Sequence, residues 1–196
     1  MLRHQTVTQE NTDEELIAAF QKGQVTAFNI LVGKYKDQLI NFVYRFLGNY
    51  DEADDVVQET FIRVYRNKYS YKPIAKFSTW IYTIAANLAK TQIKRKKHQA
   101  WFSLSRHSEE DYKNHYEIPD SHSSPEQQAD SIIIQEIIQN AINSIGAKYR
   151  EVIILFDIQE MSYEEISKIT GLNIGTVKSR LNRGRKQLQL LLKDIY

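Results

Sequence analysis

The residues best suited to binding a partner form a cationic stripe near the end of the chain, between residues 176 and 188. Five cations occur there with no acid among them: Lys178, Arg180, Arg183, Arg185 and Lys186. Apolar residues recur beside them at helical spacing: Val177, Leu181 and Leu188. A helix that is apolar on one side and cationic on the other suits the major groove of duplex DNA. The alternative is an amphipathic helix whose charged face is only solvated.

The residues before this stripe carry the signals of a helix-turn-helix. Ser162 and Glu165 have the spacing of a capping box, which satisfies free backbone donors in the first turn of a helix. Gly171 stands where a tight turn needs a positive φ. Small Ser167 before this glycine and apolar Val177 after it allow two helices to cross closely. Together these signals favour a DNA-binding helix-turn-helix over a solvated hairpin.

A second candidate surface lies on a predicted helix over 52–66, which Asp51 is placed to cap. The buried stripe of this helix comprises Ala53, Val56, Val57, Thr60, Phe61 and Val64. On another face, four residues fall together at i, i+3, i+4 and i+7 spacing: Asp55, Gln58, Glu59 and Ile62. Carboxylates around one exposed apolar residue suit docking against a basic partner helix, where Ile62 would supply apolar contact. The alternative is a face that contacts only water.

Aromatic and basic residues alternate between residues 63 and 82, and this composition suits single-stranded nucleic acid. Aromatic faces stack on unpaired bases at about 1–3 kcal/mol each, while cations follow the phosphates. Phe77 and Trp80 share the periodicity of the next helix, so we expect them in its core. Tyr69 and Tyr71 fall in a predicted loop, where we expect accessible rings. Two cations accompany them, Lys72 and Lys76.

The predicted helix 77–95 ends in a cluster of cations. Lys90 is followed by four consecutive basic residues: Lys94, Arg95, Lys96 and Lys97. Cations at the C-terminal end of a helix complement its dipole, which is a purely structural role. Four in a row exceed what a helix end requires. Contact with the backbone of duplex DNA is therefore the favoured interpretation.

Composition narrows the remaining classes of function. The chain has no cysteine, which excludes a disulfide framework, a thiol nucleophile and a cysteine zinc site. Its five histidines show no paired metal spacing, and we expect neither a metal nor a cofactor. We find no nucleophile paired with a base and no phosphate-cradling glycine loop, so an enzyme is disfavoured. The N-terminus lacks the pattern of a signal peptide and no apolar run could cross a membrane, so a cytoplasmic protein is expected.

Helical periodicity dominates the chain, and no segment alternates like a strand, so we predict an all-α fold. Further helices are expected over 13–32, broken near Gly23, over 39–47, and from residue 132 onward. Residues 105–130 carry seven acids and two bases with almost no aliphatic side chains. Such a segment buries too little surface to offset its ordering entropy. We therefore predict two small helical domains, 1–104 and 131–196, joined by a flexible acidic linker over 105–130.

These pieces together resemble a bacterial RNA polymerase sigma factor of the extracytoplasmic-function group, in the sigma-70 superfamily. Asp55–Phe61 resembles sigma region 2.2, and Phe77–Asn87 resembles regions 2.3 and 2.4. Met161–Ile166 and Gly175–Leu181 resemble region 4.2. The three motifs occur in the family order with a polar linker between them, and the match covers nearly the whole chain outside that linker. The resemblance implies a subunit that binds core RNA polymerase, recognises the −35 and −10 promoter elements and helps to open the duplex.

The resemblance also implies roles for individual residues. Contact with the clamp helices of the polymerase would involve Asp55, Gln58, Glu59 and Ile62, and the polymerase flap would be a second contact. The −35 base edges would face Lys178, Ser179, Asn182 and Arg183. Phosphates there would be held by Thr176, Arg180 and Arg185. Contact with −10 DNA would involve Tyr69, Tyr71, Lys72, Lys76, Asn87, Lys90, Lys94, Arg95, Lys96 and Lys97.

The chain departs from the family pattern in two places. The loop from Tyr71 through Phe77 would capture a flipped −10 base, and its segment 71–75 lacks the usual Gly-Asp pair. Thr91 stands where an acidic residue is common. The resemblance further implies an anti-sigma factor as partner, no insertion into the membrane, and a monomer in the free state.

A stand-alone helix-turn-helix regulator is the main alternative. It would explain residues 131–196 and leave the motifs between 51 and 97 without a purpose. It also predicts a dimerisation surface and a palindromic site. A protein that binds DNA only together with a polymerase predicts neither of these features.

Overall fold

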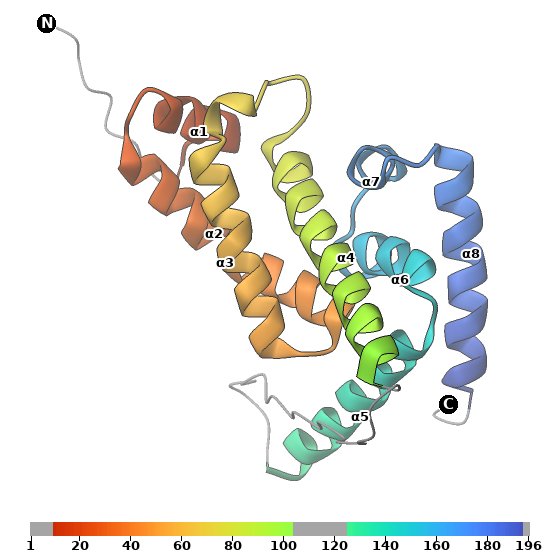
Figure 1. Ribbon diagram of the computed structural model, residues 1–196. Coiled ribbons are helices and arrows are strands. Elements are labelled where there is room, and N and C mark those ends of the chain that lie inside the picture. The colour runs from red at the N-terminus through yellow and green to blue at the C-terminus, as the bar shows by residue number, and fades with distance from the viewer. Residues whose placement is uncertain (1–9, 104–124, 194–196) are drawn as a thin grey trace, which may run out of the picture.

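The computed structural model describes residues 10–103 and 125–193, and every regular element within these ranges is helical (Figure 1). Four helices build the N-terminal region: α1 Asp13–Gln21, α2 Val25–Leu47, α3 Tyr50–Arg66 and α4 Phe77–Ser103. A short 3-10 turn, Lys68–Ser70, follows α3. The C-terminal region contains α5 Pro125–Ser144, α6 Ala147–Ile153 with a π-helical turn Ile154–Ile158, α7 Tyr163–Thr170 and α8 Ile174–Leu191. The predicted all-α class is confirmed.

Local sequence signals explain where several helices begin and end. Thr12 begins α1 with a capping box to Glu15. Gly48 ends α2 in the left-handed conformation at φ 74°, which glycine adopts without steric cost. The next residue, Asn49, is then extended and accepts a hydrogen bond from the Glu52 backbone N–H at 2.9 Å. The cap of α3 is therefore Asn49, whereas the sequence had led us to expect Asp51.

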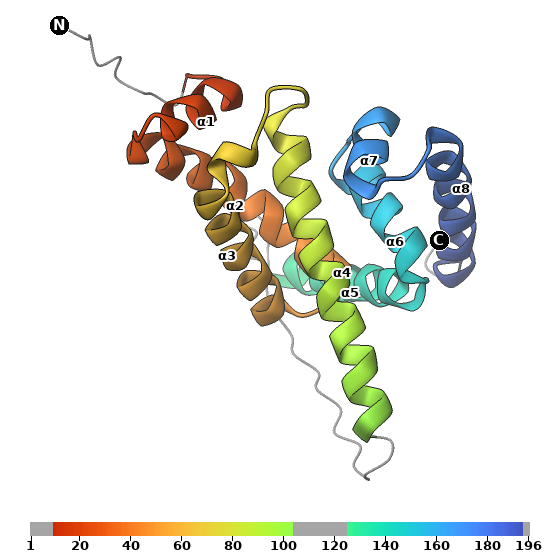
Figure 2. The ribbon, with the colours of Figure 1, turned by 45° about the horizontal axis from the view of Figure 1, so that its top comes forward.

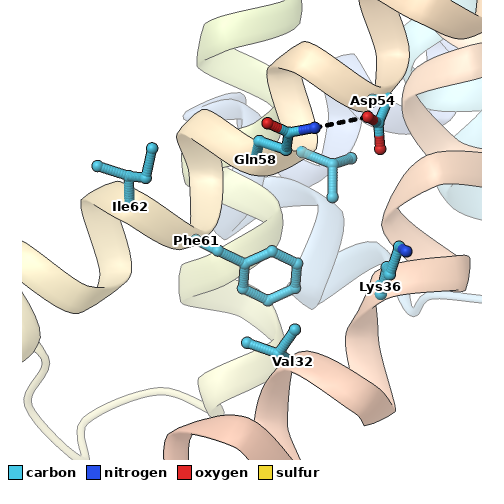
Figure 3. Close-up of a pocket in the computed structure, with 7 residues that line it drawn as sticks. Val32, Lys36, Asp54, Gln58, Phe61 and Ile62 are labelled. Carbon is cyan, nitrogen blue, oxygen red and sulfur yellow. Dashed lines mark hydrogen bonds between the residues drawn. The ribbon is translucent and has the colours of Figure 1, made fainter.

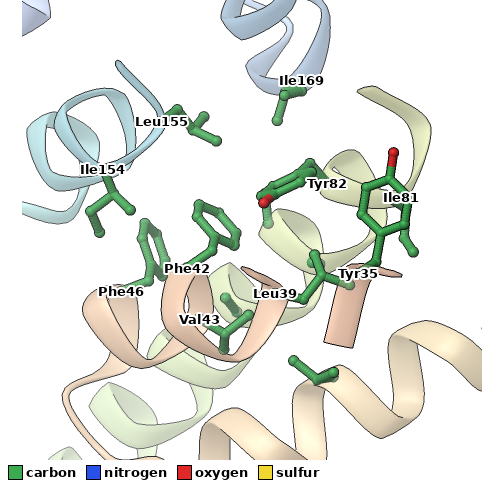
Figure 4. Packing of buried hydrophobic residues seen from close by; sticks show 14 of the residues in the cluster. Tyr35, Leu39, Phe42, Val43, Phe46, Ile81, Tyr82, Ile154, Leu155 and Ile169 are labelled. Atoms are coloured by element: carbon green, nitrogen blue, oxygen red, sulfur yellow. The ribbon is translucent and has the colours of Figure 1, made fainter. Parts of the chain in front are cut away.

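The N-terminal and C-terminal regions pack against each other through shared apolar residues. Figure 4 shows Phe42 and Phe46 of α2 facing Ile154 and Leu155, and all four side chains are buried. Nearby, the Tyr82 hydroxyl on α4 donates a hydrogen bond of 2.6 Å to Gln159 Oε1. Burial raises the pKa of Tyr82 well above its ordinary value. Figures 1 and 2 show α3 on one side of α4 and α6–α8 on the other, while the end of α2 contacts the π-helical turn and α6 directly.

Polar contacts at the end of α2 reinforce this packing. Arg150 of α6 donates a hydrogen bond of 2.7 Å to the carbonyl oxygen of Phe46. Arg45 Nη1 donates to Gln139 Oε1, and Gln139 Nε2 donates to the Arg45 carbonyl oxygen, each at 3.2 Å. α5, which carries Gln139, begins at Pro125, inside the segment predicted as a linker. Residues 105–124 of that segment lie outside the described residues.

Candidate nucleic-acid interface

The C-terminal region forms the turn that a helix-turn-helix requires. Ser162 Oγ accepts a hydrogen bond from the Glu165 backbone N–H at 3.2 Å, and Glu165 Oε2 accepts one from the Ser162 N–H at 3.0 Å. Gly171 ends α7 in the left-handed conformation at φ 72°. Asn173 then caps α8 by accepting a hydrogen bond from the Thr176 N–H at 2.7 Å. These contacts fix the angle at which α8 leaves α7.

The exposed face of α8 contains the residues predicted to read base edges. Lys178, Ser179, Asn182 and Arg183 are all exposed, whereas Val177 and Leu181 are buried toward α7 and α6. Lys178 Nζ lies 5.1 Å from the centre of the Tyr163 ring, a cation–π distance. The Arg183 guanidinium and Lys148 lower the pKa of the Tyr149 hydroxyl. The face as a whole is polar, cationic and free to meet a groove.

The three residues predicted to hold phosphates are less uniform. Thr176 is half-buried in the first turn of α8. Arg185 forms a bidentate pair with the Asp157 carboxylate, one bond of which, from Nε, measures 3.1 Å. This hydrogen bonding raises the pKa of Arg185. Arg180 is half-buried and points away from the exposed face, toward the N-terminal region, where it lines a pocket.

A glycine that the sequence reasoning passed over positions this helix. Gly184 is buried where α8 crosses α6. A Cβ at this position would lie 2.6 Å from Ile153 Cδ1 and 3.1 Å from Tyr149 Cβ. Close helix crossing therefore depends on the missing side chain. A glycine inside an otherwise helical pattern was the available signal.

The loop before α4 corrects one expectation. Tyr71 was predicted to be accessible, but its side chain is only 5% exposed. Its ring packs on Phe77 and Trp80, with ring centres 5.8 and 5.4 Å away, and its hydroxyl donates to the Ala75 carbonyl oxygen at 2.9 Å. Tyr71 is thus part of the core that shapes the loop, and in this arrangement its ring is not available to a base.

The accessible residues of this loop are different ones. Tyr69 is 67% exposed, as expected, and Lys68 Nζ lies 5.3 Å from its ring centre. Lys72 and Lys76 are exposed. Ile74 is 88% exposed, which the sequence reasoning did not anticipate. Its position beside Pro73, in a segment predicted to be a loop, was the available signal.

The cations at the end of α4 do not share one face. Lys94 and Lys97 line a pocket against the C-terminal region together with Lys90. Arg95 lines a groove on the other side, between α4 and α3. Lys96 pairs with Glu52 of α3 at 2.7 Å. Asn87, about two turns before Lys94, is exposed. Because consecutive residues on a helix are about 100° apart, four cations in a row necessarily diverge.

The predicted polymerase-contacting residues of α3 border two grooves. Gln58 and Ile62 line one of about 390 Å³ between α2 and α3 (Figure 3). Ile62 is 43% exposed there, and Gln58 Nε2 donates to Asp54 Oδ2 at 2.6 Å. The rest of this groove comprises Val32, Lys36, Asp54, Val57 and Phe61. Sequence reasoning missed Val32 and Lys36 because only the packing of α2 on α3 brings them there.

The second groove, of about 510 Å³, lies between α3 and α4 and is more polar. Asp55 and Glu59 line it with Arg63 and Arg95. Glu59 Oε1 pairs with Arg63 at 2.8 Å. The four predicted residues therefore form the ridge of α3 between two grooves, with apolar contact on one side and charge on the other.

Two further searches give negative results for the described part of the chain. Within residues 10–103 and 125–193, no group of three histidine or acidic side chains is arranged as a metal site would require. No helix in the same ranges has the length and apolar character needed to cross a bilayer.

Comparison with known proteins identifies the two regions. Residues 31–99 match the family model of sigma-70 region 2, and residues 135–188 match that of sigma-70 region 4. The chain is 38% identical over 179 residues to the ECF RNA polymerase sigma factor SigW of Bacillus subtilis, covering 91% of this chain and 96% of the relative.

Two solved structures share the fold. The sigma factor RpoE of Bartonella quintana, solved with the anti-sigma factor NepR, is 28% identical with a TM-score of 0.67, covering 85% of this chain and 96% of that one. CnrH, solved with the cytosolic domain of CnrY, is 24% identical with a TM-score of 0.68, covering 94% and 99%. The chain therefore belongs to the extracytoplasmic-function group of sigma-70 family sigma factors, which direct RNA polymerase to promoters.

Proposed function

We propose that the chain performs promoter-directed initiation through three separate surfaces and without chemistry of its own. The α3 ridge and its two grooves bind core RNA polymerase. The loop over 72–76 and the cations of α4 contact −10 DNA, and the exposed face of α8 reads the −35 element. The observation that carries this assignment is the exposed polar and cationic face of α8, which the capped turn at Gly171 holds away from the core.

The −35 contact divides between base edges and phosphates. Lys178, Ser179, Asn182 and Arg183 point outward, where a major groove would receive them. Thr176 lies in the first turn of α8, where free N–H groups favour a phosphate. Arg185 holds a phosphate only after it leaves Asp157, with which it is paired. Arg180 holds one only after it leaves the pocket that it lines against α4.

At the −10 element the exposed loop supports a role in capturing an unpaired base. Tyr71 acts here by shaping the loop from within, while Tyr69 and Ile74 present apolar surface to an unstacked base. Lys72 and Lys76 flank that surface and follow the phosphates. This division of labour replaces the direct stacking role that the sequence suggested for Tyr71.

The polymerase contact uses shape on one side of α3 and charge on the other. A partner helix docked along the ridge would bury Ile62 in the groove that Val32 and Phe61 also line. Asp55 and Glu59 would pair with its cations and fix its register. A monomer in the cytoplasm, where bacterial polymerase meets DNA, is the form we expect. An anti-sigma factor is a further expected partner, because the RpoE of Bartonella quintana was solved with one.

Transcription in vitro tests the proposal. Purified chain is added to sigma-free core polymerase on genomic fragments, and the transcript start sites are read. Specific starts that require the chain support the proposal. Starts that are random, or the same without the chain, contradict it. A shift of promoter DNA by the chain alone at physiological salt, without polymerase, would favour a stand-alone regulator instead.

A further inference from the structure

Helix α1 holds the start of the loop over 72–76, which is called the −10 loop below. Gln21, the last residue of α1, donates hydrogen bonds from Nε2 to the carbonyl oxygens of Lys68 at 2.7 Å and Tyr71 at 3.3 Å. Lys68 Nζ donates in return to the carbonyl oxygen of Phe20 at 3.0 Å. Figures 1 and 2 show α1 beside the short 3-10 turn that precedes the loop. The backbone that leads into the −10 loop is therefore fixed to α1.

The same helix holds the far end of the loop. Glu14 Oε1 accepts a hydrogen bond of 3.0 Å from the backbone N–H of Phe77, the first residue of α4. The first N–H groups of a helix have no partner within it, and a Ser, Thr, Asp or Asn before the helix usually caps them. The residue before α4 is Lys76, whose side chain has no acceptor. Glu14 supplies that acceptor from another helix, and its charge suits the positive end of the α4 dipole.

The two anchors lie on one face of α1. Glu14 and Gln21 are seven residues apart, which is about two helical turns and about 10 Å along the axis. The helix is itself fixed on α2, because its apolar side is buried and Asp13 Oδ1 pairs with Lys34 Nζ at 2.6 Å. A firmly held helix therefore sets the distance between the two ends of the −10 loop.

Between the anchors, the loop presents its tip to solvent. The Ile74 side chain is 88% exposed there. The Ile74 N–H donates to the Lys72 carbonyl oxygen at 2.7 Å, and the Tyr71 hydroxyl donates to the Ala75 carbonyl oxygen at 2.9 Å. Because both bonds are local, they shape the tip and leave its position to be set at the two ends. A loop that is already in position spares the entropy of ordering it when a base binds.

We propose that Glu14 and Gln21 are positioning residues for base capture at the −10 element. They act through the loop and not by contact with DNA. By holding both ends of the −10 loop, they keep Ile74 and the flanking lysines where an unstacked base meets them. The proposal rests on the function proposed above, because it takes this loop to be the −10 contact. Removal of either anchor should therefore weaken the −10 contact and leave the −35 contact through α8 unchanged.

The test exchanges the two polar groups between the two anchors. Glu14→Gln keeps an oxygen that accepts from the Phe77 N–H, so affinity for −10 DNA should fall by less than about threefold. Glu14→Ala removes the acceptor and should cost about tenfold. Gln21→Glu turns the donor into a carboxylate that faces two carbonyl oxygens, and it should cost about tenfold or more. An effect of charge alone predicts that Glu14→Gln strengthens binding to DNA.

Affinity is measured with the holoenzyme, formed from core polymerase and each variant chain. Two probes come from a promoter that start-site mapping identifies: a single strand that carries only the −10 element, and a duplex that carries only the −35 element. Loss of an anchor should weaken binding of the first probe, reduce the penalty for replacing its bases, and spare the second probe. Gln38→Glu, at an exposed position on α2, makes the same change as Gln21→Glu away from the loop and should leave both affinities unaltered.

Amide hydrogen exchange in the free chain gives a readout that needs no promoter. The Phe77 N–H should exchange about tenfold faster in Glu14→Ala, and so should the Ile74 N–H in Gln21→Glu, while amides in the middle of α2 stay protected. If Gln21→Glu fails to fold, Gln21→Ala replaces it and should show the same changes to a smaller extent.

Equal losses on both probes would overturn the proposal, because they would indicate general destabilisation. So would similar affinities for Gln21→Glu and Gln38→Glu, equal losses for the two Glu14 variants, or unchanged exchange at Phe77 in Glu14→Ala. The proposed function fails by a different readout, namely the absence of start sites that depend on the chain. Such start sites, together with unaltered −10 affinity in the anchor variants, would remove the positioning role and leave the function standing.

Discussion

Two arginines on α8, separated by one residue, have different surroundings and are expected to act differently. Arg185 is paired with the Asp157 carboxylate, whereas Arg183 is exposed and lowers the pKa of the neighbouring Tyr149 hydroxyl. A free guanidinium can reach two acceptors on a guanine, while a paired one is already satisfied. Base discrimination is therefore expected from Arg183, and Arg185 is expected to stiffen the turn before α7.

The substitution Arg183→Ala should cost about 1–3 kcal/mol of discrimination between promoter and random DNA, the range for losing one bidentate base contact. Competition binding of the polymerase holoenzyme on both DNAs measures it. Lys186→Ala is the matched control, since it removes an exposed cation from the same helix at a position not assigned to base reading. Equal losses on promoter and random DNA for Arg183→Ala would remove it from base reading.

Ile62 is the residue at which the polymerase contact can be tested most directly. Its side chain is 43% exposed and lines the groove between α2 and α3. Ile62→Glu should weaken binding to core polymerase by about tenfold or more, because a charge would have to be desolvated in the groove. Fluorescence anisotropy of the labelled chain with core polymerase gives the affinity. Val25→Glu, at an exposed apolar position on α2, controls for the added charge. Similar affinities for both variants would contradict docking at Ile62.

At the scale of the helical elements, the crossing of α6 and α8 depends on Gly184. Gly184→Ala should destabilise the fold by about 1–3 kcal/mol, the usual cost of overpacking, because its Cβ would meet Ile153 Cδ1 at 2.6 Å. Chemical denaturation measures the loss. Gly175→Ala is a matched control near the start of the same helix, where the nearest atom would be 3.5 Å away. Adding Ile153→Val removes the clashing methyl group and should recover part of the stability. No recovery would mean that Tyr149, whose Cβ is 3.1 Å away, sets the limit.

Elements governed by short-range signals were predictable from the sequence, and features set by packing were not. The Ser162–Glu165 capping box and the turn at Gly171 need only neighbours a few residues away, and both occur as expected. Burial of Tyr71 depends on Trp80 of the next helix, and the α3 grooves depend on α2. Neither dependence is visible in local periodicity. A misplaced cap at Asp51 has the same origin, since the left-handed exit at Gly48 decides which residue begins α3.

At the scale of the whole molecule, the sequence indicated two regions, and the structure adds how they meet. The residues that pack the two regions together, such as Phe46 and Leu155, have the local sequence pattern of ordinary core residues of their own helices. From the sequence alone, Glu151 is an acid on a helix face and Lys90 is a predicted DNA-binding cation, yet the two form an ion pair. Only the tertiary arrangement reveals that one neutralises the other. Packing of the two regions is therefore a property of the assembled chain, and its strength should depend on solution conditions that act on carboxylates.

Low pH should weaken the contact between the N-terminal and C-terminal regions, because it protonates Glu165, the partner of Lys76. The hydrogen bond from Lys76 is the largest of the causes that lower the pKa of Glu165 below its ordinary value of 4.5, and the Ser162 backbone contributes further. A group whose pKa is lowered on folding stabilises the fold above its unfolded pKa, and the gain disappears as pH falls through the folded pKa. Unfolding free energy should therefore decline below about pH 4.5.

Denaturation curves of the unaltered chain and of Lys76→Gln, taken from pH 7 down to pH 3, separate the two contributions. Lys76→Gln leaves the capping box at Ser162 intact, so some decline should remain in this variant. The difference between the two chains at pH 7 should be small, about 0.2–1 kcal/mol, because Lys76 is exposed and the pair is screened by water. That difference should vanish at low pH, where Glu165 is protonated and has no charge to offer. A difference that is constant across the range would mean that Lys76 stabilises the packing of the two regions by some other contact, and the ion pair with Glu165 would contribute nothing.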